Sequence, residues 1–572
     1  MHFKPDARVV KLRNFIIMLC KPFVAVIGLL TVFNLYMAVA LSVRPYFLKQ
    51  IINNVYLYDH TASISIFIPI FIYLFISITN ISFMRLNDYI QNIKLIPNLT
   101  KAIAMETTRL ALLSPYFFNT YQQSEKLTES ITDIIHSVSE VISVVINKFV
   151  YLFFAILVGI IVLYSVTPLF SIILLSWIIL VSFVLYCSLK KISSLSQNVI
   201  LSAAKLKHNI FDILTNIISV RLNNSEYKEQ KYIEHILDES ISSQKKTSMR
   251  HLWMWVIYGY SFICMLCINL FLLVEYKKLN IVSVGDFALV LSINIIIFDT
   301  FWTIFRDSLS FVQALDKIRL GLDCITKHFG KNNIITDRVN FPTKGNIKYS
   351  NVCLNTRDKI ILDNINTSII LGQKIAIVGS SGSGKSSFVN LLIGLLSPNS
   401  GKITCGNVEV PYRFISDNIC FISPNTMLFD RSIYENIAYS DQNVNVDDVL
   451  KAAQLTEAHD FILNMPEGYN TILSKNGVKL STGQRQRILL ARAILKKSSI
   501  TILDEAMSHL DYHTELKILN NFLQILHNKT LIVITHRLRN IYFADKVIVF
   551  KNGKILTEGS PRELYSTGVI SD

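Results

Sequence analysis

The chain has 572 residues, of which 51% are hydrophobic and 17% are charged, and its formal net charge is +15. Soluble domains carry about 25% charged residues, so this composition excludes an ordinary soluble, fibrous or disordered protein. A basic chain can bind nucleic acid, but in so apolar a chain the excess of Lys and Arg is more typical of cytoplasmic loops, and we expect no nucleic acid partner.

Long charge-free stretches predict six membrane-spanning helices. A helix that crosses about 30 Å of hydrocarbon needs about 20 apolar residues. Single spans are predicted at 22–43, 61–84, 252–274 and 287–305. Residues 149–189 lack charge over twice the needed length, and Pro168 near the middle predicts a tight turn between spans at 149–166 and 168–189. Residues 1–325 are therefore expected to form an all-α transmembrane domain.

Lys and Arg residues are distributed unevenly between the connecting segments. Residues 85–148 hold six of them and residues 190–250 hold ten, whereas the alternate loops carry only Lys49, with Arg44 at the end of the first span, and Lys277 and Lys278. The positive-inside rule then places both termini in the cytoplasm. The two long basic segments are expected to extend the helices into the cytoplasm. The composition, rich in Ile, Asn and Lys, suggests the inner membrane of a bacterium as the location.

Asp299 is the only acid deep within a predicted span. An ionisable side chain at this depth is a hypothesis of function, because it is expected to face a cavity and not lipid. The alternative is a place at the membrane edge, if the sixth helix is shifted toward Asp286.

Residues 326–572 are expected to form an α/β domain with a phosphate-binding loop. A buried-strand pattern at 374–378 precedes the sequence Gly-Ser-Ser-Gly-Ser-Gly-Lys-Ser, and an apolar helix pattern follows at 388–396. In this context the glycines let backbone N–H groups surround phosphate oxygens, Lys385 reaches the β- and γ-phosphates of ATP, and Ser386 ligates Mg²⁺. The candidate nucleotide-binding residues are Gly379, Ser380, Ser381, Gly382, Ser383, Gly384, Lys385, Ser386 and Ser387.

A second apolar strand pattern, at 500–503, ends in Asp504 and Glu505. Such a pair after a phosphate-binding loop predicts a hydrolytic site. Asp504 is placed to hold Mg²⁺ together with Ser386, and Glu505 to orient or deprotonate the attacking water. The expected cofactors are therefore ATP and Mg²⁺.

Three further motifs carry a family resemblance. Residues 480–487 read Leu-Ser-Thr-Gly-Gln-Arg-Gln-Arg and resemble the ABC signature LSGGQ. Residues 508–511 resemble the D-loop, and residues 535–537, Thr-His-Arg, resemble the switch-histidine segment. With six spans before them, the chain resembles a half-size ABC exporter over essentially its whole length.

The resemblance implies a dimer in which two ATP molecules lie between the phosphate-binding loop of one subunit and the signature of the other. It assigns a γ-phosphate contact to His536 and nucleotide contacts across the interface to Ser481, Gly483, Gln484 and Asp511. It also implies ATP-driven export of a peptide, a lipid or a small amphipathic compound. A homodimer is favoured as the partner arrangement, a heterodimer stays open, and membrane lipids are expected neighbours.

Segment 115–119 resembles the first coupling region of such exporters, and segment 216–221 resembles the segment that follows the second. We therefore expect turns near 116–120 and 210–215 that dock on the ATPase domain.

Several positions depart from the family pattern. Thr356 stands where an aromatic residue usually stacks on adenine, and Pro424 stands where a Gln usually contacts Mg²⁺ and water, although the adjacent Asn425 offers a partial substitute. Lys475-Asn476-Gly477 replaces Glu-Arg-Gly, and Thr482 replaces the signature's first Gly. One reading is an active ATPase with weaker nucleotide binding. The alternatives are a weakly or non-hydrolysing half of a heterodimer, or a non-transporting regulator with an ABC engine.

Overall fold

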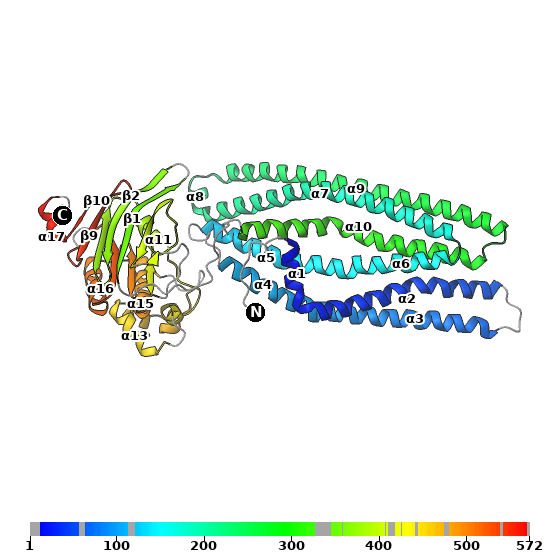
Figure 1. Cartoon of the computed structure of the whole chain (residues 1–572), viewed down its shortest axis with the longest axis horizontal. Coiled ribbons are helices and arrows are strands. Elements are labelled where there is room, and N and C mark those ends of the chain that lie inside the picture. The colour runs from blue at the N-terminus through cyan, green and yellow to red at the C-terminus, as the bar shows by residue number, and fades with distance from the viewer. Residues whose placement is uncertain are drawn as a thin grey trace. The chain divides into compact units, whose positions relative to one another are not determined.

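The computed structural model describes residues 12–56, 63–112, 121–326, 345–356, 359–406, 408–409, 418–424, 426–440, 444–473, 480–537 and 541–568. The chain divides into two compact units, Met1–Ile334 and Ile335–Asp572. The first unit is helical and the second contains β-sheets (Figure 1).

Six helical stretches of the first unit are apolar and long enough to cross a membrane, at Asn14–Tyr56, Ile66–Leu112, Leu127–Tyr164, Pro168–Thr215, Glu226–Lys278 and Val284–Ile325. The prediction of six membrane-crossing helices is thereby confirmed, and the chain is a multi-pass membrane protein. The elements of this unit are α1 (Leu12–Cys20), η1 (Lys21–Phe23), α2 (Val24–Tyr56), α3 (Ser63–Tyr89), η2 (Ile90–Leu95), α4 (Ile96–Leu112), α5 (Tyr121–Val144), η4 (Val145–Val150), α6 (Tyr151–Tyr164), α7 (Pro168–Thr215), α8 (Ile217–Leu222), α9 (Glu226–Lys278) and α10 (Val284–Thr326).

The helices continue well beyond their apolar parts, as the basic segments predicted. Helix α7 runs on from Lys190 to Thr215, which is about 39 Å at 1.5 Å per residue. One buried cluster, which includes Phe170, Trp177 and Tyr258, holds α7, α9 and α10 together along the apolar stretch. A second cluster, which includes Leu99 and Ile318, holds the extensions of α4, α5 and α10 together.

The turn expected at residues 210–215 is not there. This stretch contains no Gly or Pro, and α7 stays helical through Thr215. The helix ends at Asn216, whose N–H donates to the Asp212 carbonyl at 3.0 Å. The short helix α8 follows, and Asn224, with a left-handed φ of 48°, turns the chain into α9. The other expected turn, at 116–120, lies outside the described residues.

The second unit is built on two sheets. A six-stranded sheet has the order β10-β9-β3-β8-β7-β6, with β9, β3, β8, β7 and β6 parallel, and a four-stranded antiparallel sheet has the order β2-β1-β4-β5. The strands are β1 (Asn346–Thr356), β2 (Lys359–Ile370), β3 (Lys374–Gly379), β4 (Ser400–Cys405), β5 (Val408–Glu409), β6 (Ile419–Ile422), β7 (Ile500–Asp504), β8 (Thr530–Ile534), β9 (Lys546–Lys551) and β10 (Lys554–Gly559).

Helices cover the parallel sheet, as Figure 1 shows for α11, α15 and α16. They are α11 (Lys385–Leu392), α12 (Ile433–Ile437), η5 (Ala438–Ser440), α13 (Val446–Leu455), α14 (His459–Leu463), η6 (Gly468–Asn470), α15 (Thr482–Leu495), α16 (Tyr512–Ile525) and α17 (Pro561–Ser566).

Alternating strand residues fill both faces of this sheet. Ile502 and Ile532 belong to the cluster shared with α11 and the small sheet, whereas Leu503 and Leu531 belong to the cluster shared with α15 and α16. Because successive side chains of a strand point to opposite faces, this alternation buries β7 and β8 on both sides. The carboxyl ends of the parallel strands are then the open edge of the sheet, where ligands bind in such folds.

Candidate nucleotide site

The phosphate-binding loop joins the end of β3 to the start of α11. Gly379 has a φ of 150°, and a Cβ atom there would lie 2.3 Å from the Phe550 carbonyl oxygen of the neighbouring strand. Gly384 has a φ of 105°, and a Cβ atom there would lie 2.7 Å from Leu362 Cδ2. Only glycine fits at either position. The backbone conformation therefore explains why the motif has glycine at both Gly379 and Gly384.

Lys385 lies over this loop. Its Nζ donates hydrogen bonds of 2.9 Å to the carbonyls of Gly379 and Ser380. Burial lowers the pKa of Lys385, and the nearby carboxylates of Glu505 and Asp504 act in the opposite direction. Ser383 is 2% exposed, and its Oγ has no hydrogen-bond partner among the described residues. The loop thus holds an ammonium group and an unsatisfied hydroxyl, which fits a phosphate ligand.

Asp504 ends β7 and is 2% exposed. Burial raises its pKa, and a hydrogen bond from the Ser386 hydroxyl lowers it. Its Oδ1 atom has no hydrogen-bond partner among the described residues. A buried carboxylate oxygen without a partner is costly unless a cation offsets its charge. Asp504 and Ser386 therefore supply the oxygen ligands that Mg²⁺ prefers, and the site fits this ion.

Glu505 and His536 come together at the ends of two paired strands. Glu505 Oε1 lies 2.5 Å from His536 Nε2, and both side chains remain partly exposed. Glu505 has a left-handed φ of 50°, and its N–H donates to the Ile534 carbonyl at 3.1 Å. This strained backbone turns the carboxylate away from the strand direction and toward the histidine. The pair has the arrangement of a base oriented by a second group.

The signature residues begin α15. Ser481 Oγ accepts from the Gln484 N–H at 3.1 Å, and the Ser481 N–H donates to Gln484 Oε1 at 3.0 Å, which makes a complete capping box. Gly483 faces the D-loop, because a Cβ atom there would lie 3.2 Å from the His509 carbonyl oxygen. Ser481 and Thr482 are exposed in the single chain. The positive end of α15 is therefore open to an anion that another molecule presents.

Contacts of Asp511, Gln486 and Arg537 hold the D-loop against its neighbours, and only Asp511 was among the predicted site residues. Asp511 caps α16 by accepting from the Thr514 N–H at 3.0 Å. Gln486 of α15 contacts His509 Nδ1 at 3.1 Å. Arg537 donates to the Ser508 carbonyl at 3.0 Å and to the carboxylate of buried Glu515. Arg537 could have been suspected from the sequence because it follows His536. Its partner Glu515 could not, because only the tertiary structure brings the two side chains together.

The departures from the family pattern are described only in part. Pro424 is exposed in a turn that closes when the Thr426 N–H donates to the Ser423 carbonyl at 3.0 Å. Pro424 has no side-chain donor or oxygen for a metal or water. Asn425, Lys475, Asn476, Gly477 and the side chain of Thr356 lie outside the described residues.

Asp299 lies well inside α10. Asp286, in the first turn of this helix, pairs with Lys49 of α2 at 2.6 Å. Asp299 is thirteen positions further on, about 20 Å along the helix. Its side chain is exposed in the single chain.

Two family models match the chain. The model described as the ABC transporter transmembrane region matches residues 27–301, and the model described as ABC transporter matches residues 362–508. The chain belongs to the ABC transporter family. The transmembrane region and the ATPase domain of this ABC transporter are fused in one polypeptide, in that order.

This ABC transporter resembles curated proteins over part of its length. It is 39% identical over 226 residues to the ATP-dependent lipid A-core flippase of Acinetobacter baylyi, a match that covers 39% of each chain. It is 40% identical over 227 residues to the alpha-hemolysin translocation ATP-binding protein HlyB of Escherichia coli O6:H1, a match that covers 39% of this chain and 32% of the relative. The similarity therefore spans about a third of the length of these relatives.

A solved structure extends the likeness to almost the whole chain. A bacterial Atm1-family ABC exporter with ATP bound matches with a TM-score of 0.81 at 20% identity and covers 96% of both chains. The ABC transporter described here thus has the fold of that exporter, six helices followed by an α/β ATPase domain.

Proposed function

We propose that this ABC transporter hydrolyses ATP to drive the export of a substrate from the cytoplasm, as a dimer of half-transporters. The contact between Glu505 and His536, beside the Asp504 carboxylate and the Lys385 ammonium group, carries this proposal. It places a base next to a loop that is built to hold phosphate.

Different residues of the chain would bind the phosphates of ATP and the Mg²⁺ ion. The phosphate-binding loop, with Lys385 and Ser387 at its end, would receive the phosphates of ATP, and Ser386 and Asp504 would hold Mg²⁺. When bound, Mg²⁺ neutralises charge on the phosphate oxygens. A phosphate oxygen would give Ser383 Oγ the hydrogen-bond partner that it lacks among the described residues. Binding energy then comes from groups that are already in place.

Glu505 is assigned the reactive step. Its carboxylate orients a water molecule for attack on the γ-phosphorus and accepts the proton as the new O–P bond forms and the bond to the β-phosphate oxygen breaks. His536 holds this carboxylate in position by its 2.5 Å contact and presents its ring to the γ-phosphate. Lys385 offsets negative charge on the phosphates.

The exposed signature supports a dimer. The N-terminus of α15 is exposed, and Ser481 caps its first turn by accepting from the Gln484 N–H. A second subunit would present nucleotide to Ser481, Gly483 and Gln484, with Asp511 nearby in the D-loop. A homodimer is the simplest arrangement. Pro424, which offers no metal or water contact, favours as the second candidate a weakly hydrolysing half of a heterodimer.

The charge distribution and the named relatives bear on the direction of transport and on the substrate class. The uneven Lys and Arg distribution favours cytoplasmic termini, and the composition favours a bacterial inner membrane. The two relatives are named for lipid A-core flipping and for alpha-hemolysin translocation. We therefore propose a peptide, a lipid or a small amphipathic compound as the substrate.

The test is phosphate release by the purified full-length protein in lipid nanodiscs, with its oligomeric mass recorded. The variant Glu505→Gln keeps the size of the side chain and removes the base, and Glu467→Gln, at an exposed position away from the site, is the matched charge control. We expect vanadate-sensitive turnover in the wild type and the control, and its loss in Glu505→Gln. A wild-type homodimer that binds ATP without turnover would instead support the heterodimer.

A further inference from the structure

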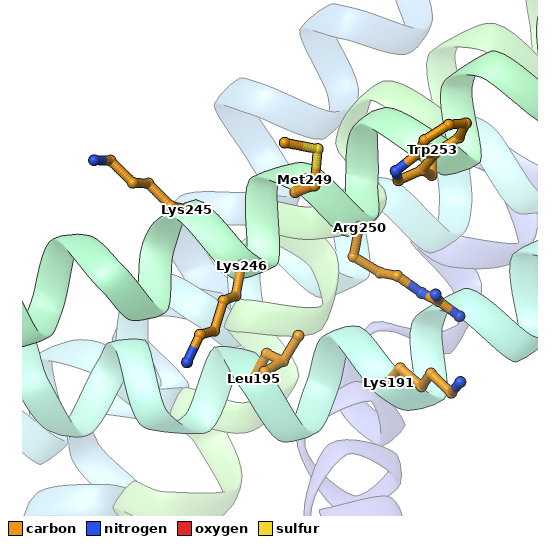
Figure 2. Close-up of a pocket in the computed structure, with 7 residues that line it drawn as sticks. All are labelled: Lys191, Leu195, Lys245, Lys246, Met249, Arg250 and Trp253. Carbon is orange, nitrogen blue, oxygen red and sulfur yellow. The ribbon is translucent and has the colours of Figure 1, made fainter.

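A cavity of about 550 Å³ lies between α7 and α9 (Figure 2). Lys191 and Leu195 of α7 form one wall. The opposite wall comes from α9, and its lining residues are Lys245, Lys246, Met249, Arg250 and Trp253. Four of these seven side chains are cationic, which is unusual for a cavity beside membrane-spanning helices.

The cavity lies at the boundary of the apolar parts of both helices. Lys190 and Lys191 end the charge-free stretch of α7, and Arg250 directly precedes the charge-free stretch that begins at Leu252 on α9. The two helices run in opposite directions and pack together, so both boundaries meet at one level. This level is where phospholipid head groups lie.

No ion pair within the described part of the chain neutralises the cations in the cavity. Among the described residues, no carboxylate oxygen lies within 4.0 Å of the charged nitrogens of Lys191, Lys245, Lys246 or Arg250. In Figure 2 the side chains of Lys191 and Arg250 extend toward the same side, whereas Lys246 extends the opposite way, past Leu195. Lys245 points away from α7. Lys191 and Arg250 are thus the two cations available to one anionic group.

An exposed apolar strip continues from the cavity along α9. Trp253 and Met249 are 59% and 56% exposed at the cavity itself. Val256, Ile257 and Tyr260 follow at the helical spacing that keeps them on the same face as Trp253, and all three are exposed. A small soluble anion would bind to the cations and would make no use of the apolar strip. An amphiphile with an anionic head and an apolar tail matches both features.

We propose that this cavity binds the anionic head group of a membrane phospholipid, whose acyl chains lie along the Trp253–Tyr260 face of α9. Other basic pockets between transmembrane helices bind acidic head groups because they are positively charged and lie at the level of the head groups in the membrane. Trp253 anchors the junction between head group and acyl chain, since an aromatic ring prefers this interface. The proposal does not depend on which substrate is exported.

The experiment measures quenching of Trp253 fluorescence by brominated phospholipids in micelles that hold the full-length protein. Brominated phosphatidylglycerol is compared with brominated phosphatidylcholine, which has the same acyl chains and no net charge. The variant Trp253→Phe is measured in parallel, because the difference between it and the wild type isolates Trp253 from the other tryptophans.

We expect half-maximal quenching of Trp253 at a roughly tenfold lower mole fraction of phosphatidylglycerol than of phosphatidylcholine. The variant Lys191→Gln/Lys246→Gln/Arg250→Gln should lose this preference. The control Arg221→Gln/Lys228→Gln/Lys231→Gln removes the same charge from exposed positions far along α8 and α9 and should keep it.

Three results would overturn the proposal. An unchanged preference in the cavity variant would show that these cations do not recognise the lipid. Loss of the preference when inorganic phosphate is added would show a site for a free anion. Absence of quenching by either lipid, together with disulfide cross-linking between copies of Met249→Cys, would show that a second copy covers the surface.

Discussion

His536 Nε2 lies 2.5 Å from Glu505 Oε1, although the two residues are 31 positions apart in the chain. The contact follows from strand pairing, because Asp504 of β7 pairs with Ile534 of β8 and each functional residue comes one or two positions later. The backbone ladder thus determines the separation of the two side chains. A histidine in this place orients the carboxylate that the proposed mechanism needs.

Replacement of His536 by Ala should slow ATP turnover with little effect on nucleotide affinity. The variant leaves Glu505 without its orienting contact, and loss of a positioned acid–base partner typically costs about 10²-fold or more in rate. Phosphate release and the Kd of a fluorescent ATP analogue, measured on the same preparation, separate the two effects. A fall in affinity as large as the fall in rate would assign His536 to binding instead.

Lys374 begins β3 and Lys385 begins α11, after the phosphate-binding loop; both lysines are buried, and they should respond differently to substitution. Lys385→Gln should abolish ATP binding and leave the thermal midpoint of the nucleotide-free protein nearly unchanged, because its Nζ bonds only two loop carbonyls, those of Gly379 and Ser380. ATP binding and differential scanning fluorimetry measure the two properties. ATP affinity equal to that of the wild type would contradict the assignment of this loop.

Lys374→Met is the matched comparison. Lys374 Nζ donates to the carbonyls of Leu526 at 2.7 Å and Lys529 at 2.5 Å, and so binds the end of the α16 segment to β3. Removal of the donor leaves buried carbonyls unsatisfied, at a cost of about 1–3 kcal/mol. We expect a lower thermal midpoint, with ATP binding retained below that temperature. A midpoint equal to that of the wild type would mean that water replaces the ammonium group without cost.

Two glycines of the phosphate-binding loop should differ in their tolerance of a methyl group. Gly379→Ala would place Cβ 2.3 Å from the Phe550 carbonyl oxygen, so β3 and β9 must separate. Gly382→Ala meets no atom within 4 Å and has only its φ of 76° to accommodate, a strain of about 1–2 kcal/mol. We expect Gly379→Ala to lower the thermal midpoint much further than Gly382→Ala. The reverse order would contradict the described register of β3 against β9.

Asp504→Asn should raise the thermal midpoint of the nucleotide-free protein at neutral pH. Burial raises the pKa of Asp504 in the folded protein above its unfolded value. Because the carboxyl pKa is higher in the folded than in the unfolded protein, ionisation of Asp504 destabilises the fold. This destabilisation is complete at pH values above the folded pKa. It disappears as the pH falls from the folded pKa to the unfolded pKa. The amide variant carries no such penalty.

The same variant should lose the stabilisation that Mg²⁺ adds to ATP binding. Thermal midpoints with ATP alone and with ATP plus Mg²⁺ measure it. Asp447→Asn serves as the control, because Asp447 is an exposed carboxyl in the first turn of α13 and is not among the nucleotide-site residues. If Mg²⁺ still stabilises Asp504→Asn as it does the wild type, Asp504 does not hold the ion.

The sequence pattern was sufficient to predict those features that depend only on residues close together in the chain. The six membrane helices were predictable because each needs a long stretch without charge. The phosphate-binding loop was predictable from the spacing between Gly379 and Ser386, and the close contacts at Gly379 and Gly384 explain why glycine is needed there. The end of α7 was misjudged by a few residues, since neither Gly nor Pro marks it and Asn216 alone closes it. The pairing of Arg537 with Glu515 and the cationic cavity between α7 and α9 join residues far apart in sequence. Tertiary packing alone decided them, because a side chain finds such partners only after strands and helices have aligned.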